Sequence, residues 1–172
     1  MRIIGGSWRG RQIGVPPGDA VRPTGDRVRE AWFSIIQFDV PQATVVDLCA
    51  GSGALGIEAL SRGASHVTFV DASAKALAIV QKNLTTLGAS PSTYTLHKGD
   101  ADTFVAALPA HAFSLGFADP PYATTVAADL SAAWKRVPFA RVFGIEHPSS
   151  VDLGDGGDRR RYGITAISFY RG

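Results

Sequence analysis

The segment Asp47-Leu48-Cys49-Ala50-Gly51-Ser52-Gly53-Ala54-Leu55-Gly56 joins an apolar run to a helical pattern. Residues 44–48 are typical of a buried strand, and residues 54–62 are typical of a helix. The glycines allow the backbone to pass close to a ligand, and the free N–H groups at the start of the helix favour an anionic one. The segment therefore predicts a strand, a loop and a helix that bind a ligand at the end of the strand.

The alternation of strand and helix continues beyond this loop. Extended runs lie at 66–71, 94–97, 113–119 and 141–147, and helical patterns lie at 28–36, 73–87, 101–108 and 124–136. Such alternation predicts an α/β fold with a mostly parallel, doubly wound sheet. The last apolar run, 162–169, follows a turn rich in Gly and Asp with no helix before it. We expect this run to return as an antiparallel strand.

Length and composition indicate one domain, residues 1–172, in a reducing compartment. The chain has 172 residues and 45% hydrophobic residues, which is enough for a core of ordinary size. Cys49 is the single cysteine, so an internal disulfide is excluded. The N-terminus lacks the apolar core of a signal peptide, and no apolar run reaches the length of a bilayer. We expect a soluble, cytoplasmic protein with no membrane partner.

Arginine is concentrated at the N-terminus. The net charge is only +2, but arginine outnumbers lysine thirteen to four, and six arginines precede residue 31. Arginine suits bidentate contacts with phosphate. Extended segments at 2–4 and 10–13 predict a small basic hairpin outside the main core, in an N-terminal arm of residues 1–24. Trp8 in this hairpin either stacks on RNA or packs on the domain. A second cluster, Arg159-Arg160-Arg161, follows three acids, and we interpret it as a solvated hairpin.

The glycine loop is compatible with two cofactors. Gly51 to Gly56 matches G-x-G-x-x-G, and Asp71 ends the next strand 20 positions after Gly51, as in a nicotinamide dehydrogenase. Asp47 would repel a pyrophosphate, however, whereas it could accept a hydrogen bond from the amino-acid portion of S-adenosylmethionine. The chain also has no room for a separate substrate domain. These observations favour S-adenosylmethionine.

Acids at successive strand ends suggest how that cofactor would lie. Asp71 could bind the ribose, and Asp100 could accept from the adenine amino group, although Asp100 could equally cap the next helix. The four histidines lack metal-ligand spacing, so we predict no metal site. The predicted cofactor-binding residues are Asp47, Ala50, Gly51, Ser52, Gly53, Ala54, Leu55, Asp71, Asp100 and Ala101.

Asp119-Pro120-Pro121-Tyr122 is the candidate catalytic segment, because it follows a strand with alternating apolar residues. The two prolines fix φ and remove two backbone donors. The Asp119 carboxylate and the Pro120 carbonyl could then accept hydrogen bonds from an exocyclic amine, while the Tyr122 ring stacks on the base. The alternative interpretation is an ordinary turn at a strand end. Cys49 could be a nucleophile in another kind of methyl transfer, but its place in the cofactor loop favours a small buried side chain.

Over nearly its whole length the chain resembles the RsmD family, bacterial 16S rRNA (guanine-N2)-methyltransferases. The resemblance rests on Met1-Arg2-Ile3-Ile4-Gly5-Gly6, Trp8-Arg9-Gly10-Arg11, Arg22-Pro23-Thr24, Asp26-Arg27-Val28-Arg29-Glu30, Ala59-Leu60-Ser61-Arg62-Gly63-Ala64 and Asp119-Pro120-Pro121-Tyr122. Asp71 stands where the family usually has glutamate.

The resemblance implies the class I methyltransferase fold, Rossmann-like, with S-adenosylmethionine as the methyl donor. It implies a guanine of 16S rRNA as the target, in an assembled or partly assembled small ribosomal subunit. We expect a monomer that binds this RNA through Arg2, Trp8, Arg9, Arg11, Arg22, Thr24, Arg27 and Arg29. A DNA or other RNA amino-methyltransferase, and a non-catalytic RNA-binding protein that keeps the fold, are the alternatives.

Overall fold

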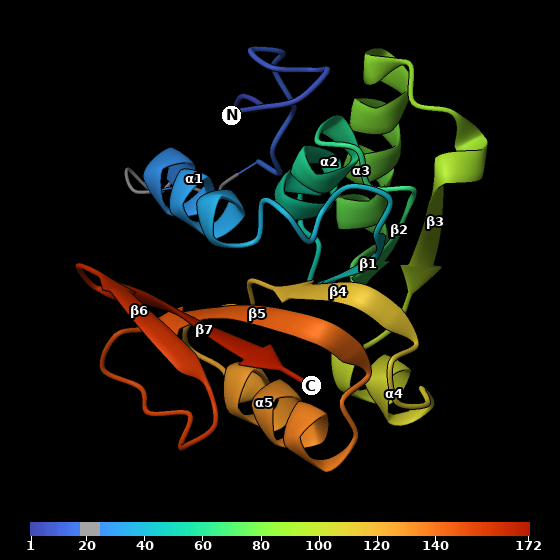
Figure 1. The fold of residues 1–172 in the computed structure, drawn as a ribbon. Helices are drawn as coiled ribbons and strands as arrows, with labels where there is room; N and C mark the ends of the chain where they lie inside the picture. Colours follow the sequence, from blue (N-terminus) through green and yellow to red (C-terminus); the bar gives the residue numbers. More distant parts are fainter. Residues whose placement is uncertain (18–24) are drawn as a thin grey trace.

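The structure, a computed structural model, describes residues 1–17 and 25–172. Within these ranges seven strands form one sheet in the order β3-β2-β1-β4-β5-β7-β6 (Figure 1). The strands are β1 Thr44–Leu48, β2 His66–Asp71, β3 Tyr94–Lys98, β4 Phe113–Ala118, β5 Ala140–Pro148, β6 Asp158–Tyr162 and β7 Thr165–Arg171. The helices are α1 Gly25–Ile35, α2 Ala54–Ser61, α3 Ala74–Leu87, α4 Ala101–Ala106 and α5 Val126–Arg136, with a 3-10 turn η1 at Pro91–Thr93.

The sheet has the topology that the alternation of elements predicts. Strands β1 to β5 are parallel, and β7 lies antiparallel between β5 and β6. Helices α1, α2 and α3 cover one face, and α4 and α5 cover the other (Figure 1). This is the Rossmann-like arrangement of class I methyltransferases. No helix in the described ranges is long and apolar enough to cross a membrane.

The C-terminal part of the sheet differs from its prediction. The antiparallel strand expected in the run 162–169 is confirmed as β7, but its expected start is wrong, because Tyr162 ends β6 and β7 begins at Thr165. Gly163 lies between them with φ 63°, a left-handed conformation that suits a tight turn. The three arginines of β6 are exposed at the edge of the sheet, so the solvated hairpin predicted there is present but is part of the sheet.

Helix α1 closes one face of the sheet through aromatic contacts. Trp32 is fully buried and makes edge-on contacts with Phe117 of β4 and Phe169 of β7, with ring centroids 5.9 and 5.8 Å apart. Gly144 of β5 allows this approach, because a Cβ there would lie 2.8 Å from both Phe169 and Trp32. The amphipathic pattern at 28–36 therefore predicted the buried face of α1 correctly.

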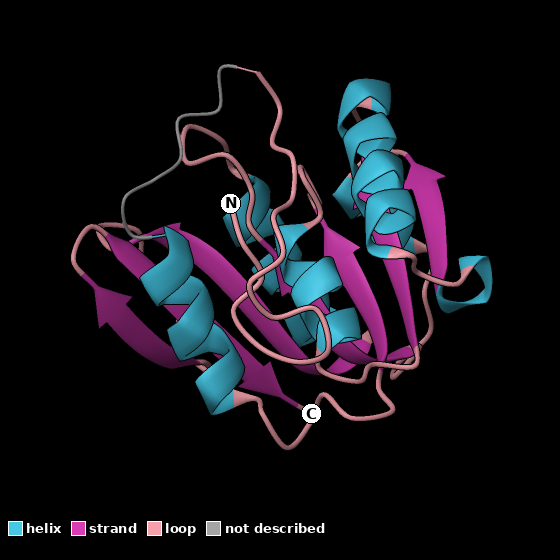
Figure 2. Cartoon of the chain, turned by 90° about the horizontal axis from the view of Figure 1, so that it is seen from above, coloured by secondary structure: helices cyan, strands magenta, loops and turns pink. Residues whose placement is uncertain are grey.

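The N-terminal segment is not separate from the core. Arg2 and Gln12 form an antiparallel bridge, which confirms the predicted hairpin pairing. Ile3 and Ile13 are, however, only 1% and 5% exposed and belong to the main hydrophobic cluster, so the expectation of a hairpin outside the core is wrong. Figure 2 shows the segment lying between α1 and α3. Asn83 of α3 holds it there with hydrogen bonds to the Gly14 N–H and carbonyl.

A buried carboxylate of α2 fixes the other end of this segment. Glu58 has no exposed surface, and its Oε2 accepts from the Ile4 N–H at 2.9 Å. Its Oε1 accepts from the Gly5 N–H at 2.8 Å and from Arg62 Nε at 2.9 Å. Three donors thus satisfy one buried charge, and the N-terminal segment is attached to the helix that follows the glycine loop.

We predict that Glu58→Gln destabilises the protein by about 1–3 kcal/mol, because an amide group turns an N–H toward at least one of these donors. Urea unfolding should show this loss, and limited proteolysis should cut residues 1–13 faster than in the parent protein. Glu30→Gln, on the exposed side of α1, is the control and should change neither. Equal stability of the two variants would show that Glu58 does not anchor the segment.

Candidate active site

The loop between β1 and α2 turns sharply at the carboxyl end of the sheet. Cys49, Gly51 and Gly53 all have left-handed backbones, with φ of 59°, 57° and 82°. This conformation is free of strain for glycine and uncommon for other residues. A Cβ at Gly51 would meet no atom within 4 Å, so that side of the loop is open. The turn brings the first N–H groups of α2 to the edge of this open space.

Two carboxylates at strand ends brace the loop. Asp47 of β1 is 2% exposed, and its Oδ2 accepts from the Gly56 N–H at 2.9 Å. Asp71 of β2 accepts from the Gly51 N–H at 2.9 Å through Oδ2 and from the Ser73 N–H at 2.8 Å through Oδ1. Each carboxylate has about four acceptor positions, so these bonds leave capacity for a ligand.

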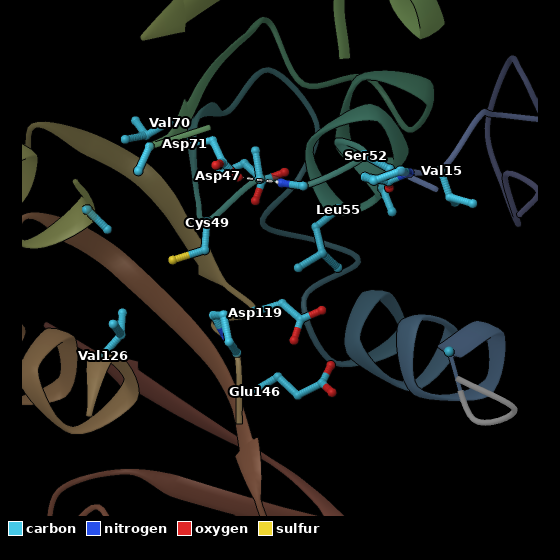
Figure 3. Close-up of a pocket in the computed structure, with 18 of the residues that line it drawn as sticks. Val15, Asp47, Cys49, Ser52, Leu55, Val70, Asp71, Asp119, Val126 and Glu146 are labelled. Atoms are coloured by element: carbon cyan, nitrogen blue, oxygen red, sulfur yellow. Dashed lines mark hydrogen bonds between the residues drawn. The ribbon is translucent and has the colours of Figure 1, made fainter. Parts of the chain in front are cut away.

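A cavity of about 710 Å³ lies beside this loop (Figure 3). Such a volume is typical of a small-molecule site. Eleven of the predicted cofactor-binding and catalytic residues line it: Asp47, Ala50, Gly51, Ser52, Ala54, Leu55, Asp71, Asp100, Ala101, Asp119 and Pro121. Gly53, Pro120 and Tyr122 do not, because Gly53 faces Ile57 and Val80 and Pro120 is buried. Residues from four strand ends thus surround one space.

The cavity has a strongly acidic wall. Burial raises the pKa of Asp47 well above its usual value, and the charges of Asp119 and Asp71 raise it further, against the opposing hydrogen bond from Gly56. Burial and the charges of Asp71 and Asp47 raise the pKa of the Cys49 thiol to about 12. A thiol with this pKa is protonated near neutral pH, which argues against the nucleophile hypothesis. The acids favour a ligand with positive charge or with N–H and O–H donors.

Asp100 occupies the N-cap position of α4, but its side chain makes no capping hydrogen bond. The interpretation of the Asp100 side chain as a helix cap is therefore wrong. Asp100 and Ala101 both line the cavity, next to Asp71 and Val70 of β2. This position leaves Asp100 available to a ligand.

The candidate catalytic segment begins directly after β4. Ala118 pairs with Ile145 of β5, so Asp119 and Glu146 are the next residues on neighbouring parallel strands. Both line the cavity, and in Figure 3 both carboxylates are directed toward α1. The Tyr122 hydroxyl donates to Glu146 Oε1 at 2.9 Å and is 2.5 Å from Thr165 Oγ1 of β7. The tyrosine is thus fixed by its hydroxyl group at the side of the cavity.

Glu146 lines the cavity although no sequence motif singled it out. A charged residue near the end of the apolar run 141–147 was a usable signal, because a buried carboxylate in a central strand usually has a specific role. Glu146 is 9% exposed.

The basic residues of the N-terminus divide into exposed and buried ones. Arg2, Arg9, Arg11 and Arg27 are exposed, and Arg11 donates to the Thr86 carbonyl at the end of α3. Trp8 is half-buried and packs against the main hydrophobic cluster, as the packing alternative required. Arg22 and Thr24 lie outside the described residues.

Arg29 does not fit the predicted RNA-binding surface. It is 5% exposed, lines the cavity, and donates through Nη2 to the Arg2 carbonyl and to Asp26 Oδ1. Its Nε and Nη1 are buried and have no hydrogen-bond partner among the described residues. The prediction of Arg29 as an RNA contact is therefore wrong, because its side chain is buried. Its positive charge at the cavity suits an anionic group of a ligand.

The cavity fits S-adenosylmethionine better than a dinucleotide. Asp47, Asp71 and Asp100 provide acceptors for an ammonium group, ribose hydroxyls and an adenine amine in the order of the strands. Val70, Leu55 and Val126 provide apolar contacts for a ring. Arg29 is the cation that could meet a carboxylate. A pyrophosphate with two negative charges would face the buried acid Asp47.

Comparisons with known proteins agree with this chemistry. Residues 1–141 match the family model Cons_hypoth95, described as conserved hypothetical protein 95. The chain is 35% identical to a Bacillus subtilis protein named "Putative rRNA methyltransferase YlbH", over 99% of this chain and 98% of that protein. It is 40% identical to ribosomal RNA small subunit methyltransferase D of Escherichia coli, over 71% of this chain and 60% of that protein.

Solved structures show the same fold. A structure of the Escherichia coli protein yhhF, described as a putative methyltransferase, matches 99% of this chain and 97% of that chain, with a TM-score of 0.84 and 29% identity. The Thermus thermophilus 16S rRNA methyltransferase RsmC, solved with AdoMet and guanosine, matches 92% of this chain and 45% of that chain, with a TM-score of 0.73. Its 20% identity shows a common fold alone.

We predict that Asp47→Asn separates stability from cofactor binding. Burial raises the pKa of Asp47 above its unfolded value, so its contribution to stability is fully present below the unfolded pKa and is lost as the pH rises through the folded pKa. Asparagine keeps an acceptor for the Gly56 N–H and has no charge. The variant should therefore gain stability relative to the parent protein as the pH rises, measured by urea unfolding between pH 4 and 8.

The same substitution should weaken S-adenosylmethionine binding by about 1.5–3 kcal/mol in calorimetry, since a charge-assisted hydrogen bond is lost. Asp155→Asn, in an exposed turn, is the control for both measurements. A stability difference that is constant with pH would show that Asp47 is not the titrating group.

Proposed function

The chain belongs to the RsmD family, whose family model is described as conserved hypothetical protein 95, and on this basis we propose that it methylates the exocyclic N2 amine of a guanine in 16S rRNA. One observation supports this most: the acceptors of Asp119 and Pro120 follow β4 directly beside a cavity that suits S-adenosylmethionine. A donor cofactor and an amine-binding segment thus meet at one edge of the sheet.

The cavity residues hold the cofactor in a fixed direction. Asp47 would accept from its ammonium group, Asp71 from its ribose and Asp100 from its adenine amine, and Arg29 would pair with its carboxylate. S-adenosylmethionine, when bound, supplies a methyl group activated by a sulfonium. Loop 49–53 and the first turn of α2 exclude water from one side of this arrangement.

Asp119 and Pro120 activate the amine by orientation. The lone pair of guanine N2 is delocalised into the ring, so the nitrogen is a poor nucleophile. When the Asp119 carboxylate and the Pro120 carbonyl each accept one N–H, the lone pair can turn out of the ring plane toward the methyl donor. Positioning of two reactants can contribute up to about 7–11 kcal/mol in ideal cases. The proton shed by the product nitrogen passes to Asp119 or to solvent, and no covalent enzyme intermediate is needed.

Tyr122 is held in place beside this site. Its hydrogen bonds to Glu146 and Thr165 hold the side chain at the end of the catalytic segment. Extrusion of a base costs on the order of a few kcal/mol, which stacking on an aromatic ring can offset. Stacking on Tyr122 stays a prediction.

The substrate is 16S rRNA in an assembled or partly assembled small ribosomal subunit, and the chain acts as a monomer and as one domain. The exposed arginines at 2, 9 and 11 belong to the N-terminal segment between α1 and α3, and Arg27 belongs to α1. They can hold RNA backbone while one base enters the cavity.

The proposed substrate is tested by offering labelled S-adenosylmethionine with unmodified small subunits and with naked 16S rRNA. Transfer to DNA or to other RNA at a higher rate would contradict the proposed substrate.

We predict that Asp119→Ala lowers the methyl-transfer rate about a hundredfold or more, in line with removal of one preorganised electrostatic group. The affinity for S-adenosylmethionine should change little, because Asp119 acts on the target amine. Single-turnover transfer and calorimetry measure the two quantities. Asp155→Ala is the control of equal charge. A folded Asp119→Ala variant that methylates at the parent rate would disprove the orienting role.

The exposed N-terminal arginines should set the salt dependence of RNA binding. Each phosphate contact contributes about 0.7–0.9 to the slope of log K against log salt, so Arg9→Gln with Arg11→Gln should reduce the slope by about 1.4–1.8. The substrate KM should rise, while S-adenosylmethionine affinity stays unchanged.

The matched control is Arg136→Gln with Arg141→Gln. Arg136 ends α5, on the opposite face of the sheet, and Arg141 lies at the start of β5, away from the cavity. This pair removes the same charge and should leave the slope unchanged. A slope that falls equally in both double variants would show a general charge effect, and an unchanged slope in the first would place the RNA-binding surface elsewhere.

A further inference from the structure

The acceptors of Asp119 and Pro120 do not by themselves select guanine. They can bind any exocyclic amine, and adenine, cytosine and guanine all have one. The bases differ beside that amine. In guanine, N2 is next to N1, which has a hydrogen. The amine of adenine is flanked by the acceptors N1 and N7, and that of cytosine by the acceptor N3 and a C–H. Guanine alone presents a second donor next to its amine.

A second acceptor stands next to Asp119 in the structure. Ala118 of β4 pairs with Ile145 of β5, so Asp119 and Glu146 come from neighbouring positions on strands about 4.8 Å apart. Both line the cavity, and their carboxylates are directed to the same side in Figure 3. Acidic side chains at neighbouring positions on two adjacent strands can converge on the edge of one base.

A hydrogen bond from Tyr122 helps to orient Glu146. Its side chain is 9% exposed, and Oε1 accepts from the Tyr122 hydroxyl at 2.9 Å. Thr165 Oγ1 lies 2.5 Å from the same hydroxyl. Because Tyr122 closes the catalytic segment, the carboxylate on β5 and the amine acceptors after β4 are connected through one side chain.

We propose that Glu146 is the residue that specifies guanine, by accepting a hydrogen bond from N1–H while Asp119 and Pro120 hold N2. This inference rests on the proposed function and adds the group that selects the base. Because a carboxylate has about four acceptor positions, an oxygen of Glu146 can accept from N1–H while the Tyr122 hydroxyl keeps its own hydrogen bond. The same oxygen opposes the N1 lone pair of adenine and the N3 lone pair of cytosine, since two acceptors without a proton between them repel.

The test compares guanine with 2-aminopurine, which keeps the exocyclic amine but has an acceptor at N1 in place of N1–H. Once the methylated guanine is mapped, the substrate RNA is prepared with guanine or with 2-aminopurine at that position. Single-turnover transfer is then measured for each. The parent enzyme should prefer guanine by about ten- to a hundredfold, the range for one hydrogen bond to a charged group.

Glu146→Gln should reverse or abolish this preference. If the Gln oxygen stays with the Tyr122 hydroxyl, its NH2 group faces the base and can donate to N1 of 2-aminopurine. Transfer to guanine should fall, while transfer to 2-aminopurine stays or rises. Thr165→Val is the matched control, because it removes the other contact of the Tyr122 hydroxyl and keeps the carboxylate. Its overall rate can fall, but its preference for guanine should persist.

The outcomes separate the two levels of the proposal. If Glu146→Gln still methylates guanine and keeps the parent preference for it, the role of Glu146 is overturned and the proposed function stands. A parent enzyme that methylates both RNAs equally would overturn it without any variant. No transfer to either RNA would overturn the proposed function, and the assignment of Glu146 with it.

Discussion

Two hydrogen bonds hold the site together, from the Gly56 N–H to Asp47 and from the Gly51 N–H to Asp71. Both carboxylates lie near the carboxyl ends of neighbouring parallel strands, so the sheet fixes the position of the loop between β1 and α2. The remaining features follow from the same parallel order, because the carboxyl ends of β1, β2, β4 and β5 all meet at one edge. The cofactor cavity, the amine-binding segment and Glu146 are neighbours for this reason.

Proteins with a Rossmann-like fold bind several cofactors, and the charge of the cavity selects among them. The acids that raise the pKa values of Asp47 and Cys49 belong to several strand ends, so the negative potential comes from the fold and not from one residue. It favours a cofactor with a sulfonium and an ammonium group and disfavours the pyrophosphate of a dinucleotide. Arg29 provides positive charge at one side of the cavity, beside α1. A glycine motif alone could not distinguish these cofactors.

The sequence predicted elements whose periodicity is set by burial. Strands β1 and β2 have their predicted bounds, and the Trp32 face of α1 is buried as expected. The prediction of strands failed where burial gives no pattern, because β6 is an exposed edge strand of arginines and Gly163 interrupts an apolar run that looked continuous.

In the site, strand-end acids were visible in the sequence, but the burial of Arg29 and the hydrogen bond between Tyr122 and Glu146 depend on contacts distant in sequence. The many basic residues of the N-terminal hairpin predicted an exposed segment, whereas Ile3 and Ile13 in the same segment are buried in the core.

Identification of the product nucleoside tests the central claim most directly. Unmodified small subunits are incubated with the protein and S-adenosylmethionine bearing a deuterated methyl group, and the 16S rRNA is digested to nucleosides for mass spectrometry. We expect the label in N2-methylguanosine at a single guanine. Label in a methylated adenosine or cytidine, or no label in RNA from a protein that binds S-adenosylmethionine, would contradict a guanine-N2 methyltransferase.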